Sequence, residues 1–226
     1  MNGNTQMRSV VVTGGTVRLG AIIADRLEAL GWNVVRTSHR SDPLADIVVD
    51  LSRAGGAEAL FSAAVSLLGG RAPDALVNNA ALFSLDDTDP IELNYRTPKR
   101  LIELMAAHPG VRSVVNVLDS RVLAREPLTP YEKSKAALRD CTIEYARRYS
   151  GIVRVNAVAP GPVLVPVDVR EMAGTTPFGR PQPADVASAV AFLLEAPTTT
   201  GCIIPVDGGQ WMQDLNIAGK CDGVVV

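Results

Sequence analysis

Tyr131 and Lys135 lie four residues apart in the stretch YEKSK, so they share one face of any helix that contains them. A tyrosine has an ordinary pKa of about 10, too high for efficient acid–base work at neutral pH unless a nearby cation stabilises the phenolate. Lys135 is such a cation. The pair is therefore a candidate acid–base centre, although a tyrosine and a lysine on an exposed helix face are the commoner arrangement.

A second candidate site is the stretch VVVTGGTVRLG at residues 10–20. Gly14 and Gly15 follow a β-branched run and Gly20 enters an apolar-periodic segment, an arrangement that lets backbone amides approach a pyrophosphate at a helix N-terminus. Arg18 stands where a nucleotide-binding turn would have a further glycine. Its guanidinium could contact cofactor phosphates. The glycines alone would also fit a plain strand-to-helix turn.

The stretch SHRS at residues 38–41 indicates which cofactor the turn would hold. Dinucleotide folds that prefer NAD place a carboxylate after the second strand, against the ribose 2′-hydroxyl. Here His39, Arg40 and Ser41 follow the strand instead, and Arg40 offers planar, charge-assisted donors to a 2′-phosphate. These residues predict NADPH as the cofactor. A solvated polar turn is the alternative.

The elements that would position these residues alternate strictly between strand and helix. Strands are expected at residues 9–13, 33–38, 46–50, 74–79, 113–119, 153–160 and 202–209, and helices at 18–30, 57–70, 91–107, 130–149 and 183–196. Pro98 predicts a kink or a late start in the helix at 91–107, because proline lacks a backbone N–H. The alternation predicts an α/β fold: one doubly wound, Rossmann-like parallel sheet with helices on both faces and a site beyond the carboxyl ends of its strands.

Composition narrows the class of protein. With 226 residues, 47% of them hydrophobic, the chain can bury the core of a single domain spanning 1–226, with a folded part at about 8–212 and a tail at 213–226. The net charge of −2 comes without a basic stripe, which argues against nucleic acid as a partner and favours a small molecule. The three cysteines are far apart and no histidine lies at metal-ligand spacing from them, so we expect a reducing compartment and no metal site. The sequence also has no signal-peptide core and no apolar run long enough to span a membrane, which predicts a cytoplasmic protein.

In order and spacing, the glycine loop, NNA at 78–80, Asn94, the Tyr131/Lys135 pair and PGP at 160–162 resemble the short-chain dehydrogenase/reductase family over about residues 8–212. The resemblance implies that Tyr131 is the general acid, that Lys135 binds the nicotinamide ribose and lowers the tyrosine pKa, and that Asn94 holds a water in a proton relay. The residues expected to contact the cofactor are Gly14, Thr16, Arg18, Leu19, Gly20, His39, Arg40, Ser41, Asp50, Leu51, Asn79, Ala80, Lys135, Pro160 and Gly161.

One departure from the family pattern bears on the substrate. The family usually has a serine about a dozen residues before the tyrosine, where this chain has Asp119 followed by Ser120. The aspartate, the arginine before LG and the HRS stretch resemble the pteridine reductase and dihydromonapterin reductase branch, in which an aromatic residue matching Phe83 stacks a pterin. That resemblance implies substrate contacts from Phe83, Asp119, Tyr131 and Arg18. Core packing for Phe83 and Ser120 as the family's serine remain alternatives.

The leading hypothesis is therefore an NADPH-dependent reductase that delivers hydride to a pterin C=N bond while Tyr131 protonates the nitrogen. Two alternatives stay open: a carbonyl reductase of a small ketone or diketone, and a cofactor-binding regulator without turnover. The resemblance also implies a homodimer or homotetramer built on the helices at 91–107 and 130–149. We further expect a short substrate lid at 163–181, and a tail that docks because it ends in the apolar run GVVV.

Overall fold

The computed structural model describes residues 7–83, 89–108, 112–124, 126–163 and 176–213. Within these ranges the chain forms a seven-stranded sheet in the order β3-β2-β1-β4-β5-β6-β7, with every neighbouring pair parallel. The strands are β1 (Ser9–Val12), β2 (Asn33–Ser38), β3 (Ile47–Val48), β4 (Ala75–Asn78), β5 (Arg112–Val117), β6 (Val153–Pro160) and β7 (Ile203–Val206). The predicted doubly wound parallel sheet is thus confirmed.

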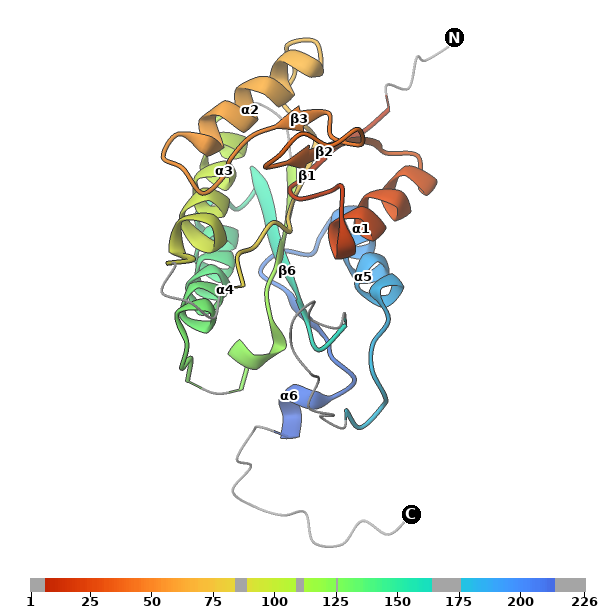
Figure 1. The fold of residues 1–226 in the computed structure, drawn as a ribbon, viewed down its shortest axis with the longest axis vertical. Coiled ribbons are helices and arrows are strands. Elements are labelled where there is room, and N and C mark those ends of the chain that lie inside the picture. The colour runs from red at the N-terminus through yellow and green to blue at the C-terminus, as the bar shows by residue number, and fades with distance from the viewer. Residues whose placement is uncertain (1–6, 84–88, 109–111, 125, 164–175, 214–226) are drawn as a thin grey trace, which may run out of the picture.

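Helices cover both faces of the sheet (Figure 1). One face carries α1 (Arg18–Ala29) and α5 (Pro183–Glu195), and the other carries α2 (Gly56–Leu67), α3 (Thr97–Ala106) and α4 (Pro130–Arg148). The strands supply a core to each side: on β1, Val11 packs toward α2, α3 and α4, whereas Val10 and Val12 pack toward α1 and α5. This alternation explains the near-continuous apolar runs, because a strand covered on both faces has no side that meets water.

Three elements differ from the sequence-based expectation. The strand expected at 46–50 is only Ile47–Val48, since the Asp46 carboxylate accepts a hydrogen bond from the Arg36 backbone and Asp50 starts a turn by accepting from the Ser52 backbone. The strand expected at 202–209 ends at Val206, because Asp207 turns the chain into the short helix α6 (Gln210–Gln213) by accepting from the backbone N–H groups of Gly209 and Trp211.

The helix expected at 91–107 is divided. A π-helical turn at Glu92–Arg96 precedes α3, and Pro98 lies in the first turn of α3. A regular α-helix would need the Pro98 nitrogen to donate to the carbonyl of Asn94, four residues earlier, and proline has no N–H. The predicted irregularity is therefore present, as a widened turn that contains Asn94.

Among the described residues, no helix has the length and apolar character needed to cross a membrane.

Candidate active site

The glycine loop lies where the strand order reverses, between the carboxyl ends of β1 and β4, which is the usual ligand position in doubly wound sheets. Thr13 ties the two strand ends together: its hydroxyl accepts from the backbone N–H groups of Asn79 (2.9 Å) and Ala80 (3.0 Å). The Asn79 side chain donates to the Thr13 carbonyl at 2.9 Å. Asn79 and Ala80 of the stretch NNA therefore hold the start of the glycine loop in place through Thr13.

Gly14 and Gly20 keep the loop close to the start of α1. Gly14 has a left-handed backbone, with φ +63°. A Cβ added at Gly20 would lie 2.0 Å from the Gly14 carbonyl oxygen and 2.5 Å from the Asn79 amide nitrogen, so no side chain fits there. The result is a tight cradle at a helix N-terminus, where backbone N–H groups favour an anion.

Arg18 is exposed and has φ +52°, the left-handed conformation that glycine adopts easily and that costs other residues about 1–2 kcal/mol. The chain therefore keeps an arginine at a position whose backbone suits glycine. Strain of this kind is found mainly where a side chain has a role. This geometry is consistent with the phosphate contact expected from the sequence.

Replacing Arg18 by glycine is expected to stabilise the fold by about 0.5–1 kcal/mol, because the relieved strain exceeds the added entropy of the unfolded chain. The same change should weaken binding of NADPH. Arg18→Ala is the matched control, since it removes the charge and keeps the strain. Denaturant unfolding and cofactor titration of both variants check this, and an Arg18→Gly protein that gains no stability would contradict the strain argument.

The end of β2 presents the residues expected to hold a 2′-phosphate. Ser38 is buried, whereas His39, Arg40 and Ser41 are exposed, and the Arg40 backbone donates to the Ser38 hydroxyl at 3.3 Å. Asp42, the nearest acidic residue along the chain, accepts from the Leu44 backbone at 2.9 Å within its own turn. The first side chains beyond this strand are thus basic or hydroxylic.

The remaining predicted cofactor residues are divided among several strand ends. Asp50 accepts from the backbone and hydroxyl of Ser52, which hold its pKa below the usual value, while Leu51 is buried. Gly161 follows β6 at Pro160, and an added Cβ there would lie 2.7 Å from the Asp207 Cβ, so this glycine is explained by packing alone. Thr16 is buried and Leu19 is half-buried on the loop and α1.

Helix α4 carries the tyrosine and the lysine, and a capping box fixes its start. The Thr129 hydroxyl accepts from the Glu132 backbone at 3.1 Å, and the Glu132 carboxylate accepts from the Thr129 backbone at 3.2 Å. Lys135 is buried and donates from Nζ to the carbonyl of Val117, at the end of β5, at 2.7 Å. Burial lowers the pKa of Lys135 to about 8, against the opposing effect of Asp119.

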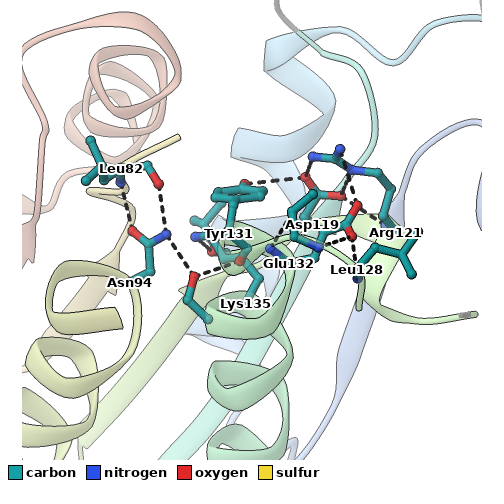
Figure 2. Close-up of polar contacts among 11 residues, drawn as sticks. Leu82, Asn94, Asp119, Arg121, Leu128, Tyr131, Glu132 and Lys135 are labelled. Atoms are coloured by element: carbon teal, nitrogen blue, oxygen red, sulfur yellow. Dashed lines mark hydrogen bonds and ion pairs between the residues drawn. The ribbon is translucent and has the colours of Figure 1, made fainter. Parts of the chain in front are cut away.

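Tyr131 lies between that lysine and a carboxylate (Figure 2). Its ring centroid is 6.0 Å from Lys135 Nζ, and its hydroxyl donates to Asp119 Oδ2 at 3.4 Å. Burial raises the pKa of Tyr131, and the negative charge of Asp119 adds to that effect. Ser120, the alternative to Asp119, is buried in the short 3-10 helix Ser120–Val122, so the residue that the structure brings to the tyrosine is Asp119.

Asn94 is fully buried and links the loop after β4 to α4. Its side-chain oxygen accepts from the Leu82 backbone at 2.8 Å, while its amide group donates to the Leu82 carbonyl at 3.0 Å and to the Ser134 hydroxyl at 3.0 Å. Ser134 in turn donates to the Tyr131 carbonyl at 2.7 Å. Asn94 thus fixes the position of the tyrosine's helix. Ser134 was not among the predicted site residues, although its place between Tyr131 and Lys135 was the available signal.

Phe83 supplies an apolar surface beside the tyrosine. The two rings meet edge to face with centroids 4.9 Å apart, and Phe83 is 50% exposed. Core packing, the alternative for this residue, does not describe a ring with half of its surface in solvent. The lid expected at 163–181 lies largely outside the described residues, and the tail from residue 214 lies entirely outside them.

Arg121 is a second residue of the site that was not predicted from the sequence. It pairs with Asp119 through both terminal oxygens: Nε donates to Oδ1 at 2.9 Å and a terminal nitrogen donates to Oδ2 at 2.8 Å. Its guanidinium carbon lies 5.6 Å from the ring centroid of Tyr131 and 5.9 Å from that of Phe83. No spacing rule connects an arginine in the 3-10 helix Ser120–Val122 to a tyrosine on the following helix.

Within the described residues, no group of histidine, cysteine, aspartate and glutamate side chains could hold a metal ion.

Comparison with known proteins supplies relatives for this arrangement. The family described as enoyl-(acyl carrier protein) reductase matches residues 18–210. A 3beta-hydroxysteroid dehydrogenase 1 from Eggerthella lenta is 32% identical over 251 aligned positions, covering 90% of this chain and 93% of the relative.

Solved structures with the same fold carry nicotinamide cofactors. FolM alternative dihydrofolate reductase 1 from Brucella canis, complexed with NADP, superposes with a TM-score of 0.76 at 29% identity, covering 91% of this chain and 94% of that one. The 3-alpha-hydroxysteroid dehydrogenase from Pseudomonas sp. B-0831, complexed with NADH, gives 0.79 at 26% identity, covering 89% and 96%. These solved structures therefore share the fold of this chain and hold a nicotinamide cofactor, whereas the substrates named for them differ.

Proposed function

The chain belongs to the short-chain dehydrogenase/reductase family of NAD(P)-dependent oxidoreductases, and on this premise we propose that it reduces a C=N bond of a pterin with NADPH. The observation that carries the substrate class is the half-exposed ring of Phe83 against the edge of Tyr131. A flat heteroaromatic substrate could stack on such a ring beside a proton donor. The likeness to an alternative dihydrofolate reductase supports this choice.

The residues fit a nicotinamide dinucleotide. The cradle formed by Gly14 and Gly20 leaves no room for a Cβ at Gly20 and opens at the N-terminus of α1, where a pyrophosphate is favoured. Exposed His39 and Arg40 follow β2, and a 2′-phosphate would meet them without a repelling carboxylate. Arg18 adds a positive charge to the same loop. These features favour NADPH over NADH.

The proton path follows from the contacts of Tyr131. When bound, the nicotinamide cofactor supplies the hydride, which adds to the carbon of the substrate C=N bond. Tyr131 gives its hydroxyl proton to the adjacent nitrogen, and the phenolate that remains is stabilised by the buried charge of Lys135. Lys135 is oriented by the Val117 carbonyl. Asn94 and Ser134 hold the backbone of Tyr131 in place.

Reduction of a ketone is the second candidate. It is supported by the named activity of the Eggerthella lenta relative, a hydroxysteroid dehydrogenase. A carbonyl oxygen would call for a hydrogen-bond donor beside Tyr131, and Asp119 instead accepts hydrogen bonds from that tyrosine and from Arg121. This acceptor is the reason for ranking the pterin first.

A substrate screen separates the candidates. We expect NADPH oxidation with dihydropterins and little with diketones, measured by NADPH absorbance. Asp119→Asn should lower kcat/KM on the pterin, and Asp119→Ser should lower it while improving a diketone that accepts a hydroxyl donor. Activity confined to ketones would remove the pterin proposal. No turnover of any substrate, with NADPH still bound, would favour a cofactor-binding regulator.

A further inference from the structure

Asp119 creates an electrostatic problem for the reaction proposed above. A serine, the usual residue at this place, carries no charge, but a carboxylate 3.4 Å from the Tyr131 hydroxyl opposes formation of the phenolate. Burial raises the pKa of Tyr131, and the negative charge of Asp119 raises it further. A proton donor that becomes harder to ionise is a weaker acid, so an uncompensated Asp119 would slow proton transfer.

Arg121 is placed to cancel that charge. Its side chain makes a bidentate pair with Asp119, at 2.8 and 2.9 Å, and its backbone N–H donates to Asp119 Oδ1 at 3.0 Å. With the hydroxyl of Tyr131, these contacts take up the roughly four acceptor positions of a carboxylate. Asp119 is thus already saturated by this chain's own donors.

The same guanidinium also acts on the tyrosine directly. It lies 5.6 Å from the Tyr131 ring centroid, and its charge opposes the increase in the pKa of Tyr131. A terminal nitrogen of Arg121 lies 3.6 Å from the buried carboxylate of Glu132, which caps α4 next to Tyr131. The arginine therefore joins both carboxylates that face the tyrosine, while Lys135 faces it from the other side.

We propose that Arg121 is a positioning residue that holds Asp119 as an ion pair and thereby keeps Tyr131 acidic enough to donate its proton. The inference rests on the proposed role of Tyr131. In this proposal, Asp119 and Arg121 together take the place of a neutral serine. The carboxylate of Asp119 orients the Tyr131 hydroxyl, and the guanidinium of Arg121 offsets the unfavourable effect of that carboxylate on phenolate formation.

The test compares the parent with variants that lose the charge of Arg121, of Asp119 or of both. The quantity measured is the pH dependence of kcat/KM for reduction at saturating NADPH. In the parent, activity should fall with increasing pH as the coupled pair of Tyr131 and Lys135 loses a proton. In Arg121→Gln this fall should move up by about one pH unit, the lower end of shifts caused by a single close charge, and turnover at neutral pH should decrease. Asp119→Asn should move the fall down. The double variant has lost both charges, so its fall should lie close to that of the parent.

Two further variants separate charge from structure. Arg121→Lys keeps the charge without the bidentate geometry and should shift the fall less than Arg121→Gln. Arg100→Gln is the matched control, because Arg100 on α3 pairs with Glu58 on α2 and with Glu103 on its own helix, and its removal should leave the profile unchanged. A double variant that shifts as far as Arg121→Gln alone, or a lysine variant that behaves like the glutamine one, would overturn the proposal.

A spectroscopic titration makes the result independent of the substrate. Tyrosinate absorbance of the complex with NADP⁺, with Tyr131→Phe subtracted as the blank, reports ionisation of Tyr131 apart from that of Lys135. The pKa of Tyr131 is expected to be higher than in the parent for Arg121→Gln, lower for Asp119→Asn and close to the parent value for the double variant. If no pterin is turned over but the order holds, the proposed substrate is wrong and the role of Arg121 stands; an unchanged Tyr131 titration in Arg121→Gln would remove that role.

Discussion

Replacing Tyr131 by phenylalanine is expected to lower turnover by about 10²- to 10⁴-fold, the usual contribution of a positioned general acid. The change removes one hydroxyl and keeps the ring that packs edge to face on Phe83. Lys135 would keep its hydrogen bond to the Val117 carbonyl, so the cofactor side of the site should persist. Steady-state kcat with NADPH and the best substrate of the screen measures the loss, and cofactor titration should show nearly unchanged binding.

Tyr149→Phe provides the control for this variant. Tyr149 lies just beyond the C-terminal end of α4, where its ring packs edge to face against Tyr145 with centroids 5.2 Å apart. Tyr149→Phe also removes one tyrosine hydroxyl, but at the opposite end of α4 from Tyr131 and away from the site. Turnover of the Tyr149 variant should match the parent. A Tyr131→Phe enzyme with more than a tenth of parental turnover would show that the proton comes from another group.

Replacing Arg40 by alanine is expected to weaken NADPH binding by about ten- to hundredfold and to leave NADH binding nearly unchanged. A charge-assisted hydrogen bond contributes about 1.5–3 kcal/mol, and tenfold in affinity corresponds to about 1.4 kcal/mol. Arg40 is exposed at the carboxyl end of β2, so the side chain is free to meet a 2′-phosphate and its loss should not disturb the core. Fluorescence titration of both cofactors gives the two dissociation constants.

Arg71→Ala serves as the comparison, because Arg71 is also exposed but precedes β4 at the amino end of the sheet. Both variants lose one positive charge, and only the Arg40 variant should discriminate between the cofactors. The salt dependence should follow the same pattern, since a contact with a phosphate is screened. Equal losses for NADPH and NADH in Arg40→Ala would argue against a 2′-phosphate contact at this position.

The order of strands and helices could be predicted from the sequence because the signals are local. Val10, Val11 and Val12 form a β-branched run that suits a strand buried on both faces, and the structure buries all three. Thr129 and Pro130 are a typical N-cap and first helical residue, and α4 begins at Pro130. The four-residue spacing of Tyr131 and Lys135 then places both side chains on one helix face without further information.

The sequence predicts the ends of an element less well where a side chain takes a backbone hydrogen bond that a longer strand or helix would use. The strand expected at 46–50 keeps only Ile47 and Val48 because Asp46 also bonds a backbone N–H of β2 through its carboxylate. The widened turn around Asn94 could be anticipated as an irregularity at Pro98, but not as a π-helical turn. Both outcomes depend on contacts that a local pattern does not contain.

Only the tertiary structure could decide the electrostatics of the candidate site. The sequence favoured Asp119 at the family's serine position but left Ser120 as an alternative, since one residue of register in a loop reverses which side chain faces the site. The fold turns Asp119 to Tyr131 and buries Ser120. Arg121 pairs with Asp119 beside Tyr131 on the next helix, and no spacing of residues along the sequence predicts this arrangement. Periodicity is a property of neighbouring residues along the chain, whereas the acidity of a side chain depends on every charge that the fold brings within a few ångströms of it.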